Sequence, residues 1–243
     1  MSDGSVRLAA RAISVSFGGL FALAGVDVAV EAGEMLGLIG ANGAGKSTLI
    51  NVLSGFQRPS AGEVNLGSMS LVGLPPHRVA RLGVSRTFQS VRLFRELSVY
   101  DNVAAAAAVL GKQAPNPADL LKAMDHLSLS DRPAGSLPYA HQRRLAIARA
   151  LALKPQFLLL DEPAAGMTPE EVRDLDEALV SLRKRTGAGI LLVEHNMALV
   201  MGVCERVVVL DGGRVIAEGP PQTVRRDPAV RRAYLGHTAE AAT

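Results

Sequence analysis

Eight residues in the first fifth of the chain have the spacing of a loop that binds phosphate groups. Residues 40–47 read Gly-Ala-Asn-Gly-Ala-Gly-Lys-Ser and match the pattern G-x-x-x-x-G-K-[ST] in full. Glycines let the backbone curve around a polyphosphate with its N–H groups pointing inward, and the helix expected to begin near Lys46 adds the positive end of its dipole. The pattern predicts a phosphate site formed by Gly40, Asn42, Gly43, Ala44, Gly45, Lys46, Ser47 and Thr48.

Two polar side chains of this loop indicate how it would hold a nucleotide. Lys46 is expected to reach the β- and γ-phosphates, and the hydroxyl of Ser47 is expected to bind Mg²⁺. A short apolar run precedes the loop, and a helical pattern follows it. That strand–loop–helix context is the one the motif requires.

A pair of carboxylates further along the chain could complete a metal site. Three leucines that are typical of a buried strand lead directly into Asp161 and Glu162. A carboxylate at the end of such a strand fits the role of holding Mg²⁺, and Glu162 beside it could polarise an attacking water. Alone, an Asp-Glu pair is more often part of a solvated loop. The phosphate loop upstream favours the metal-site interpretation, because both halves of the site then lie on one α/β domain.

The elements that must position these residues alternate along the chain. Hydrophobic periodicity and turn signals predict strands at residues 8–17, 26–30, 35–39, 157–160, 190–193, 206–210 and 214–218. The helical spacing of apolar residues predicts helices at 47–53, 118–127, 143–153 and 169–185, the second of them capped by Asn116. Alternating strands and helices imply a mostly parallel sheet that helices cover.

Length and composition limit the class of protein. The 243 residues are 48% apolar and 20% charged, which is enough to bury the core of a single α/β domain. A net charge of +3 and only three Tyr and six Phe argue against nucleic acid as a partner. Cys204 is the one cysteine, as expected of a cytosolic chain, and no apolar run reaches the roughly 18–20 residues of a membrane span.

The motifs, taken in order, resemble the nucleotide-binding subunits of ABC transporters over about residues 6–237. Phe17 lies 29 residues before Lys46, where that family places an aromatic ring on adenine, although Phe21 is a rival. Gln89 matches the glutamine of the family's Q-loop, which touches Mg²⁺ or the attacking water. His195 follows a predicted strand and matches the switch histidine that contacts the γ-phosphate.

This resemblance implies a fold and an activity. The fold is α/β, with a P-loop NTPase core and a mostly parallel sheet, an N-terminal antiparallel β subdomain, a short helical insertion at about 90–153 and a tail at 238–243. The activity is an ATPase coupled to transmembrane solute transport, with ATP and Mg²⁺ as cofactors. The implied catalytic residues are Glu162, His195 and Gln89, and the implied metal site is formed by Ser47, Gln89 and Asp161.

The segment that matches the family's signature departs from it. The usual text is Leu-Ser-Gly-Gly-Gln, and this chain has Leu137, Pro138, Tyr139, Ala140 and His141. In the family, the serine hydroxyl and glycine amides bind the γ-phosphate held by the opposite subunit, whereas Pro138 has neither a hydroxyl nor an N–H. Two interpretations stay open: the site completed in trans is weakened, or the remaining amides and the helix N-terminus suffice. The family's D-loop aspartate is also replaced, by Thr168.

Other segments resemble one subfamily. Residues 86–95, the Tyr139 variant, residues 163–166 and residues 227–236 look like an ATPase subunit of branched-chain amino acid uptake systems. That implies a second ATPase subunit, as a heterodimer or a homodimer, two membrane permeases and an external binding protein. It also implies a peripheral location on the cytoplasmic face of a bacterial inner membrane.

Two alternatives to this function stay open. One is an ATP-binding regulatory subunit with a degenerate signature site. The other is the motor of a urea, amide or aromatic-acid importer, because a cytosolic motor does not touch the solute. Only 47 residues separate Gln89 from Leu137, which is short for the subfamily. The helical insertion that meets the permease is expected to be shorter, so the sequence does not define the docking surface.

Overall fold

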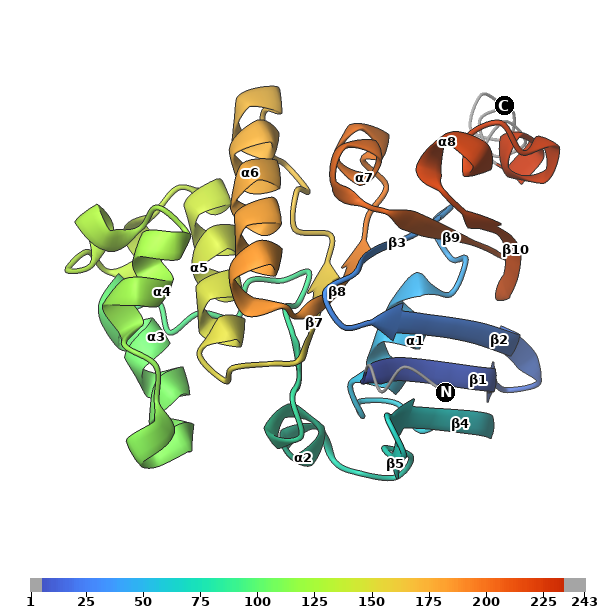
Figure 1. Cartoon of the computed structure of the whole chain (residues 1–243), viewed down its shortest axis with the longest axis horizontal. Coiled ribbons are helices and arrows are strands. Elements are labelled where there is room, and N and C mark those ends of the chain that lie inside the picture. The colour runs from blue at the N-terminus through green and yellow to red at the C-terminus, as the bar shows by residue number, and fades with distance from the viewer. Residues whose placement is uncertain (1–5, 234–243) are drawn as a thin grey trace.

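Two β-sheets lie side by side, and most of the helices gather on one face of the larger sheet (Figure 1). The structure, a computed structural model, describes residues 6–233. The tail expected at 238–243 and the end of the segment 227–236 lie outside the described residues. Within 6–233, no helix combines the length and the apolar character needed to cross a membrane.

The smaller sheet is antiparallel and confirms the N-terminal β subdomain. Its strands run in the order β2-β1-β4-β5. Their bounds are Arg7–Phe17 for β1, Leu20–Glu31 for β2, Ala61–Leu66 for β4 and Met69–Ser70 for β5. The alternation at residues 8–17 predicted the first strand, and the turn between β1 and β2 is made by Gly18 and Gly19, both at positive φ.

The larger sheet is parallel except for one edge strand, as the sequence predicts. Its order is β10-β9-β3-β8-β7-β6, with only β10 antiparallel to its neighbour. The strands are β3 (Met35–Gly40), β6 (Val84–Arg86), β7 (Phe157–Asp161), β8 (Gly189–Val193), β9 (Arg206–Asp211) and β10 (Arg214–Gly219). The carboxyl ends of β3, β7 and β8 therefore meet at one edge, which is where ligands bind in open α/β sheets.

Eight α-helices lie wholly within residues 6–233, and residues 228–233 are helical as well. The eight are α1 (Lys46–Leu53), α2 (Pro76–Arg81), α3 (Val99–Ala107), α4 (Pro117–Ala123), α5 (Tyr139–Leu151), α6 (Pro169–Thr186), α7 (Met197–Val203) and α8 (Pro221–Val224). Short 3₁₀ turns cover Ala108–Gln113, Leu127–Leu129 and Ala134–Ser136. Figure 1 shows α3 and α4 beside α5, at the end of the molecule away from the antiparallel sheet.

Local chemistry explains where α6 begins and ends. The Thr168 hydroxyl accepts the N–H of Glu171, and the Glu171 carboxylate accepts the N–H of Thr168, so the two residues form a capping box. Pro169 occupies the first helical position, and Gly187 ends the helix at φ 64°. Thr168, which stands where the family has its D-loop aspartate, is therefore an N-cap.

Two predicted helix boundaries were wrong. The helix expected at 118–127 ends at Ala123, because Asp125 adopts a left-handed φ of 57° that no helix continues through. Its predicted cap is confirmed, since the Asn116 side chain accepts the N–H of Ala118. The helix expected at 143–153 begins earlier, at Tyr139, so the last three signature residues form its first turn.

The larger sheet separates two buried clusters. Met35 and Ile39 of β3 join the cluster formed with α3 to α7, whereas Leu36 and Leu38 point the other way, into the cluster formed with α1 and the antiparallel sheet. Because successive side chains of a strand point to opposite faces, one short apolar run serves both clusters. The sheet edge that carries the polar residues is thereby fixed from both sides.

One carboxylate, Asp176 of α6, forms no hydrogen bond with the residues that the structure describes. Its Oδ2 lies 3.5 Å from the position that a Cβ on Gly202 of α7 would occupy, and its Oδ1 is buried without a partner. Burial raises the pKa of Asp176 to about 6. Ionisation of Asp176 is therefore less favourable in the folded protein than in the unfolded chain.

We expect Asp176→Asn to increase the free energy of unfolding at pH 8, because burial penalises only the ionised carboxylate. Since the folded pKa lies above the ordinary value of 3.8, the carboxyl favours folding most below pH 4, and this contribution is lost as pH rises through about 6. The gain should therefore shrink between pH 8 and pH 4.5 in urea unfolding. Glu177→Gln, at an exposed position on the same helix, is the control. An equal gain at both pH values would contradict this account.

Candidate nucleotide-binding site

The phosphate loop connects β3 to α1 and is packed by two distant segments. Gly45, at φ 105°, precedes α1, and a Cβ there would lie 2.6 Å from the carbonyl oxygen of Ala22, so only glycine fits. Gly213, in the turn between β9 and β10, donates its N–H to Ala44 and accepts the N–H of Ala24. The loop is therefore held between the antiparallel sheet and the last hairpin.

Lys46 lies across the loop. Its buried Nζ donates to the carbonyl oxygens of Gly40 (2.7 Å) and Ala41 (2.9 Å). Burial lowers the pKa of Lys46, and the nearby carboxylates of Glu162 and Asp161 oppose that shift. The structure thus brings the phosphate loop and the carboxylate pair together, as the sequence predicts.

Asp161 is paired with an arginine for which the sequence suggested no role. Its Oδ2 lies 3.1 Å from Nη2 of Arg86, and both side chains are more than nine-tenths buried. Burial raises the pKa of Asp161, whereas the Arg86 guanidinium acts in the opposite direction. Arg86 also donates to Asn51 (2.6 Å) and Ser54 (3.1 Å), both of which follow the phosphate loop. Arg86 lies at the end of β6, a strand that the sequence analysis did not predict.

Gln89 and His195 meet at Glu162. Gln89 Nε2 donates to Oε2 of Glu162 at 2.9 Å, and His195 Nδ1 lies 3.7 Å from Oε1. The Glu162 backbone has a φ of 47°, which is rare for a residue other than glycine. Its N–H donates to Val193, and its carbonyl oxygen accepts from Arg143. The three residues expected to be catalytic are therefore brought together around one carboxylate whose backbone is held on both sides.

A second buried glutamate supports this arrangement, and the sequence analysis missed it. The carboxylate of Glu194 accepts the N–H groups of Ala164 (2.8 Å), His195 (3.2 Å) and Asn196 (3.3 Å). Burial raises the pKa of Glu194, while these N–H donors and His195 oppose the shift. It ties the segment after Glu162 to the one that carries His195. Its full burial at the end of a strand could not be read from a single sequence.

The two candidate adenine-stacking rings lie on the hairpin of the antiparallel sheet. Phe17 is 55% exposed and Phe21 is 63% exposed. In the strand register Phe17 faces Leu20, and Ser16 faces Phe21, so the two rings project from opposite faces of the hairpin. A nucleotide on one face can therefore stack on only one of them.

The signature residues lie at the start of α5. Leu137 and Ala140 are buried, Pro138 is the N-cap, His141 is half-buried and Tyr139 is exposed. Within the described part of the chain, no hydrogen bond joins these residues to the phosphate loop. Their role in an opposite subunit's site stays a prediction.

The oxygen donors at the site fit Mg²⁺. Ser47 offers a hydroxyl, Asp161 a carboxylate and Gln89 an amide oxygen, all of which are hard ligands. Residues 6–233 contain no group of three or more His, Cys, Asp or Glu placed to hold a metal ion. A few protein oxygens combined with phosphate oxygens are the set that Mg²⁺ prefers.

The fold and the site define a P-loop ATPase, and comparisons with known proteins specify the family. A family model described as ABC transporter matches residues 23–165, and one described as branched-chain amino acid ATP-binding cassette transporter matches residues 214–240. The chain is 41% identical to the high-affinity branched-chain amino acid transport ATP-binding protein LivG of Salmonella typhimurium, covering 94% of this chain and 97% of that one.

Further relatives and a solved structure agree. The corresponding protein BraF of Pseudomonas aeruginosa is 40% identical, covering 92% of this chain and 95% of its own. The lipopolysaccharide export system protein LptB of Acidithiobacillus ferridurans is 39% identical, covering 87% and 89%. A crystal structure of an ABC transporter ATP-binding cassette in its ADP conformation matches with a TM-score of 0.87 at 29% identity, covering 95% and 99%.

The chain belongs to the ATP-binding proteins of ABC transporters. This confirms the family resemblance, the α/β fold class and the ATPase class expected from the sequence, with ATP as the nucleotide.

We expect Arg86→Met to lower the free energy of unfolding by about 3 kcal/mol, because it leaves Asp161 as a buried carboxylate without its partner. The same substitution in an Asp161→Asn background should cost much less, since no charge is then stranded. Urea unfolding of the wild type, the two single variants and the double variant measures the difference. Arg92→Met removes a guanidinium from the ring of Phe88, 4.1 Å away, without stranding a carboxylate, and is the matched control. Equal losses in both backgrounds would show that Arg86 acts by packing alone.

Proposed function

We propose that this chain is the ATP-hydrolysing motor subunit of an ABC importer for branched-chain amino acids. The observation that carries the hydrolytic part is the meeting of Gln89 and His195 at Glu162, beside Lys46 and Asp161. A carboxylate held by two polar side chains at the edge of a phosphate site suits the positioning of an attacking water.

The chain's residues would divide the work of phosphoryl transfer. The amides of the phosphate loop and Lys46 bind the β- and γ-phosphates, and Phe17 stacks on the base. Glu162 accepts a proton from the attacking water, and His195 contacts the γ-phosphate. Catalysis of this kind comes mostly from placement and charge stabilisation.

Ser47, Asp161 and Gln89 are the residues that would hold Mg²⁺. When bound, the ion neutralises charge on the phosphate oxygens. Arg86 binds one oxygen of Asp161 and keeps that buried carboxylate from standing unpaired.

Support for the solute comes from one end of the chain. Overall identity does not separate the candidates, because LivG at 41% and LptB at 39% are nearly equal. The match of residues 214–240 to a branched-chain amino acid cassette model favours that class. Urea, amide and aromatic-acid importers remain alternatives, since the solute is selected by other subunits.

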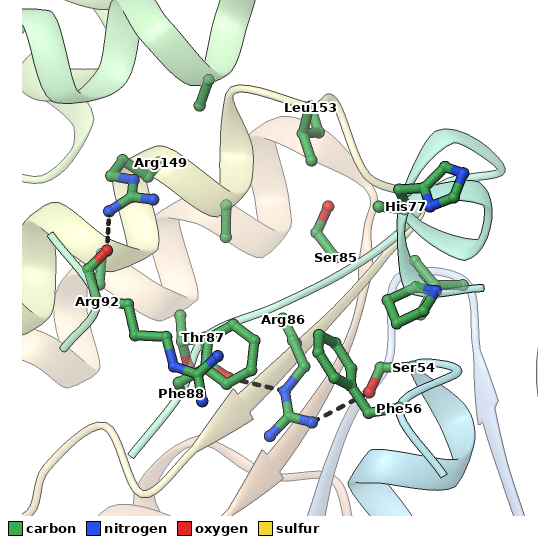
Figure 2. A pocket seen from close by; sticks show the side chains of 16 residues that line it. Ser54, Phe56, His77, Ser85, Arg86, Thr87, Phe88, Arg92, Arg149 and Leu153 are labelled. Carbon is green, nitrogen blue, oxygen red and sulfur yellow. Dashed lines mark hydrogen bonds between the residues drawn. The ribbon is translucent and has the colours of Figure 1, made fainter. Parts of the chain in front are cut away.

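The partners of this proposal are a second ATPase subunit, two permeases and, indirectly, an external binding protein. A hollow of about 360 Å³ between α2, β6 and α5 is suited to a permease segment. Figure 2 shows that Phe56, Phe88 and Arg92 line it together with Arg86. Because Phe88 precedes Gln89, a segment seated there would act directly on the Glu162 cluster. Such a subunit works on the cytoplasmic face of the membrane.

A regulatory ATP-binding subunit is the second candidate, and Pro138 is the observation that favours it. Pro138 caps α5 without a hydroxyl or an N–H to offer a phosphate. In that case the site on the other subunit's phosphate loop, which this chain's signature completes, would be inactive. The assembled transporter would then hydrolyse ATP at one site instead of two.

We expect Glu162→Gln to keep ATP binding and lower turnover of the assembled transporter by 10²-fold or more, because the water loses its base. Steady-state ATPase assays and nucleotide titration measure the two effects separately. Glu96→Gln, at an exposed position, is the control. Unchanged turnover in Glu162→Gln would contradict the role of Glu162 in the motor function, whereas counting the sites that turn over per transporter separates the motor from the regulatory candidate.

Phe17→Ala should weaken ATP binding about fivefold through loss of stacking, whereas Phe21→Ala, on the opposite face of the hairpin, should not. Binding of tripolyphosphate should be the same in both variants, because it has no base to stack. The reverse pattern would assign the stacking role to Phe21.

A further inference from the structure

Arg143 of α5 connects the signature segment to the backbone of Glu162. Its Nη2 donates to the phenol oxygen of Tyr139 at 2.7 Å, and its Nη1 donates to the carbonyl oxygen of Glu162 at 3.0 Å. The guanidinium carbon lies 4.9 Å from the centre of the Tyr139 ring. One rigid planar group therefore bridges a signature residue and the residue expected to act as base.

Tyr139 has one buried side and one exposed side. A Cβ on Gly166 would lie 3.9 Å from its ring, so the ring packs on the segment that follows Glu162. The residue is nevertheless 47% exposed, at the first position of α5. A molecule that approaches the start of α5 from outside can therefore contact Tyr139.

Burying the charged side chain of Arg143 at this position costs free energy. It is 5% exposed, no carboxylate forms a salt bridge with it in the described structure, and its Nε is buried without a partner. Asp161 interacts with its charge only at longer range. A buried cation without a direct ion pair is costly, and an apolar side chain would pack there at less cost. Its two hydrogen bonds, to the Tyr139 phenol oxygen and to the Glu162 carbonyl oxygen, therefore explain why an arginine stands here.

The hydrogen bond at the carbonyl oxygen of Glu162 affects where the carboxylate of this residue points. The left-handed backbone of this residue directs its carboxylate to Gln89 and His195. The N–H is held by Val193 of β8, and the carbonyl by Arg143. Moving Arg143 would therefore change the aim of the carboxylate without touching the phosphate loop.

We propose that Arg143 is a positioning residue that couples Tyr139 to Glu162. Resting on the proposed motor function, the inference is that nucleotide carried by an opposing ATPase subunit contacts Tyr139, and that Arg143 passes the resulting shift to the Glu162 backbone. The Tyr139 side chain thus takes part in signalling between the two ATP sites of the dimer. This role differs from that of the serine and glycines of the usual signature, which this chain lacks.

The test is a double-mutant cycle on the assembled transporter. Tyr139→Phe removes the phenol oxygen and keeps the ring, and Arg143→Lys keeps the charge but cannot span both oxygens. We expect each to lower kcat about tenfold with an unchanged Kd for ATP, because only the aim of Glu162 is affected. The double variant should be no slower than Arg143→Lys, since both changes break one connection.

Arg144→Lys is the matched control, because Arg144 is the neighbouring buried arginine of α5 and pairs with Asp174 instead. Its kcat should stay at the wild-type value. Effects of Tyr139→Phe and Arg143→Lys that multiply, an unchanged kcat in Tyr139→Phe, or a loss in Arg144→Lys as large as in Arg143→Lys would each overturn the coupling. Because Tyr139→Phe removes a single oxygen from a residue that is 47% exposed, it keeps the test decisive if Arg143→Lys folds poorly.

Failure of the proposed function gives a different result. If Glu162→Gln turns over like wild type, the role of Glu162 is wrong whatever the cycle shows. If Glu162→Gln is inactive and the Tyr139 and Arg143 effects are independent, the motor function stands and the coupling falls.

Discussion

Charged groups drawn into one edge of a covered sheet are the constraint on which this molecule depends. Lys46, Arg86 and Asp161 are all largely buried where β3, β6 and β7 end. Charges cannot stay there unpaired, so each is given partners: carbonyl oxygens for the lysine, and a guanidinium for the carboxylate. The cost of such burial explains why a residue with no expected catalytic or binding role, such as Arg86, is structurally necessary.

Much of the fold could be predicted from the sequence because its signals are local. The runs at 35–39 and 157–160 are short, apolar and bounded by polar residues, and both form buried parallel strands. The helix ends were harder. The end of α4 depends on one left-handed residue, Asp125, and the start of α5 depends on Pro138 serving as N-cap, which sequence periodicity does not reveal.

The candidate site likewise has residues that the sequence reveals and residues that only the structure reveals. Spacing alone identified the phosphate loop, and the resemblance to the ABC family placed Gln89, Glu162 and His195 in one candidate site. The partners that hold them were missed, because Arg86, Arg143 and Glu194 carry ordinary residue types at positions whose burial arises only from tertiary packing. Motif matching thus found the groups that would touch ATP, and the structure adds the groups that fix their orientation.

The clamp on the phosphate loop has a consequence for the life of the chain. Gly45 rests against Ala22, and Ala44 and Ala24 are both hydrogen-bonded to Gly213, so segments almost 190 residues apart must meet before the loop is fully packed. During synthesis the loop leaves the ribosome long before its last support. Contacts of such separation form late in folding. A ribosome-bound chain that ends before the β9–β10 hairpin therefore holds every phosphate-loop residue without the hydrogen bonds that Gly213 makes to Ala44 and Ala24.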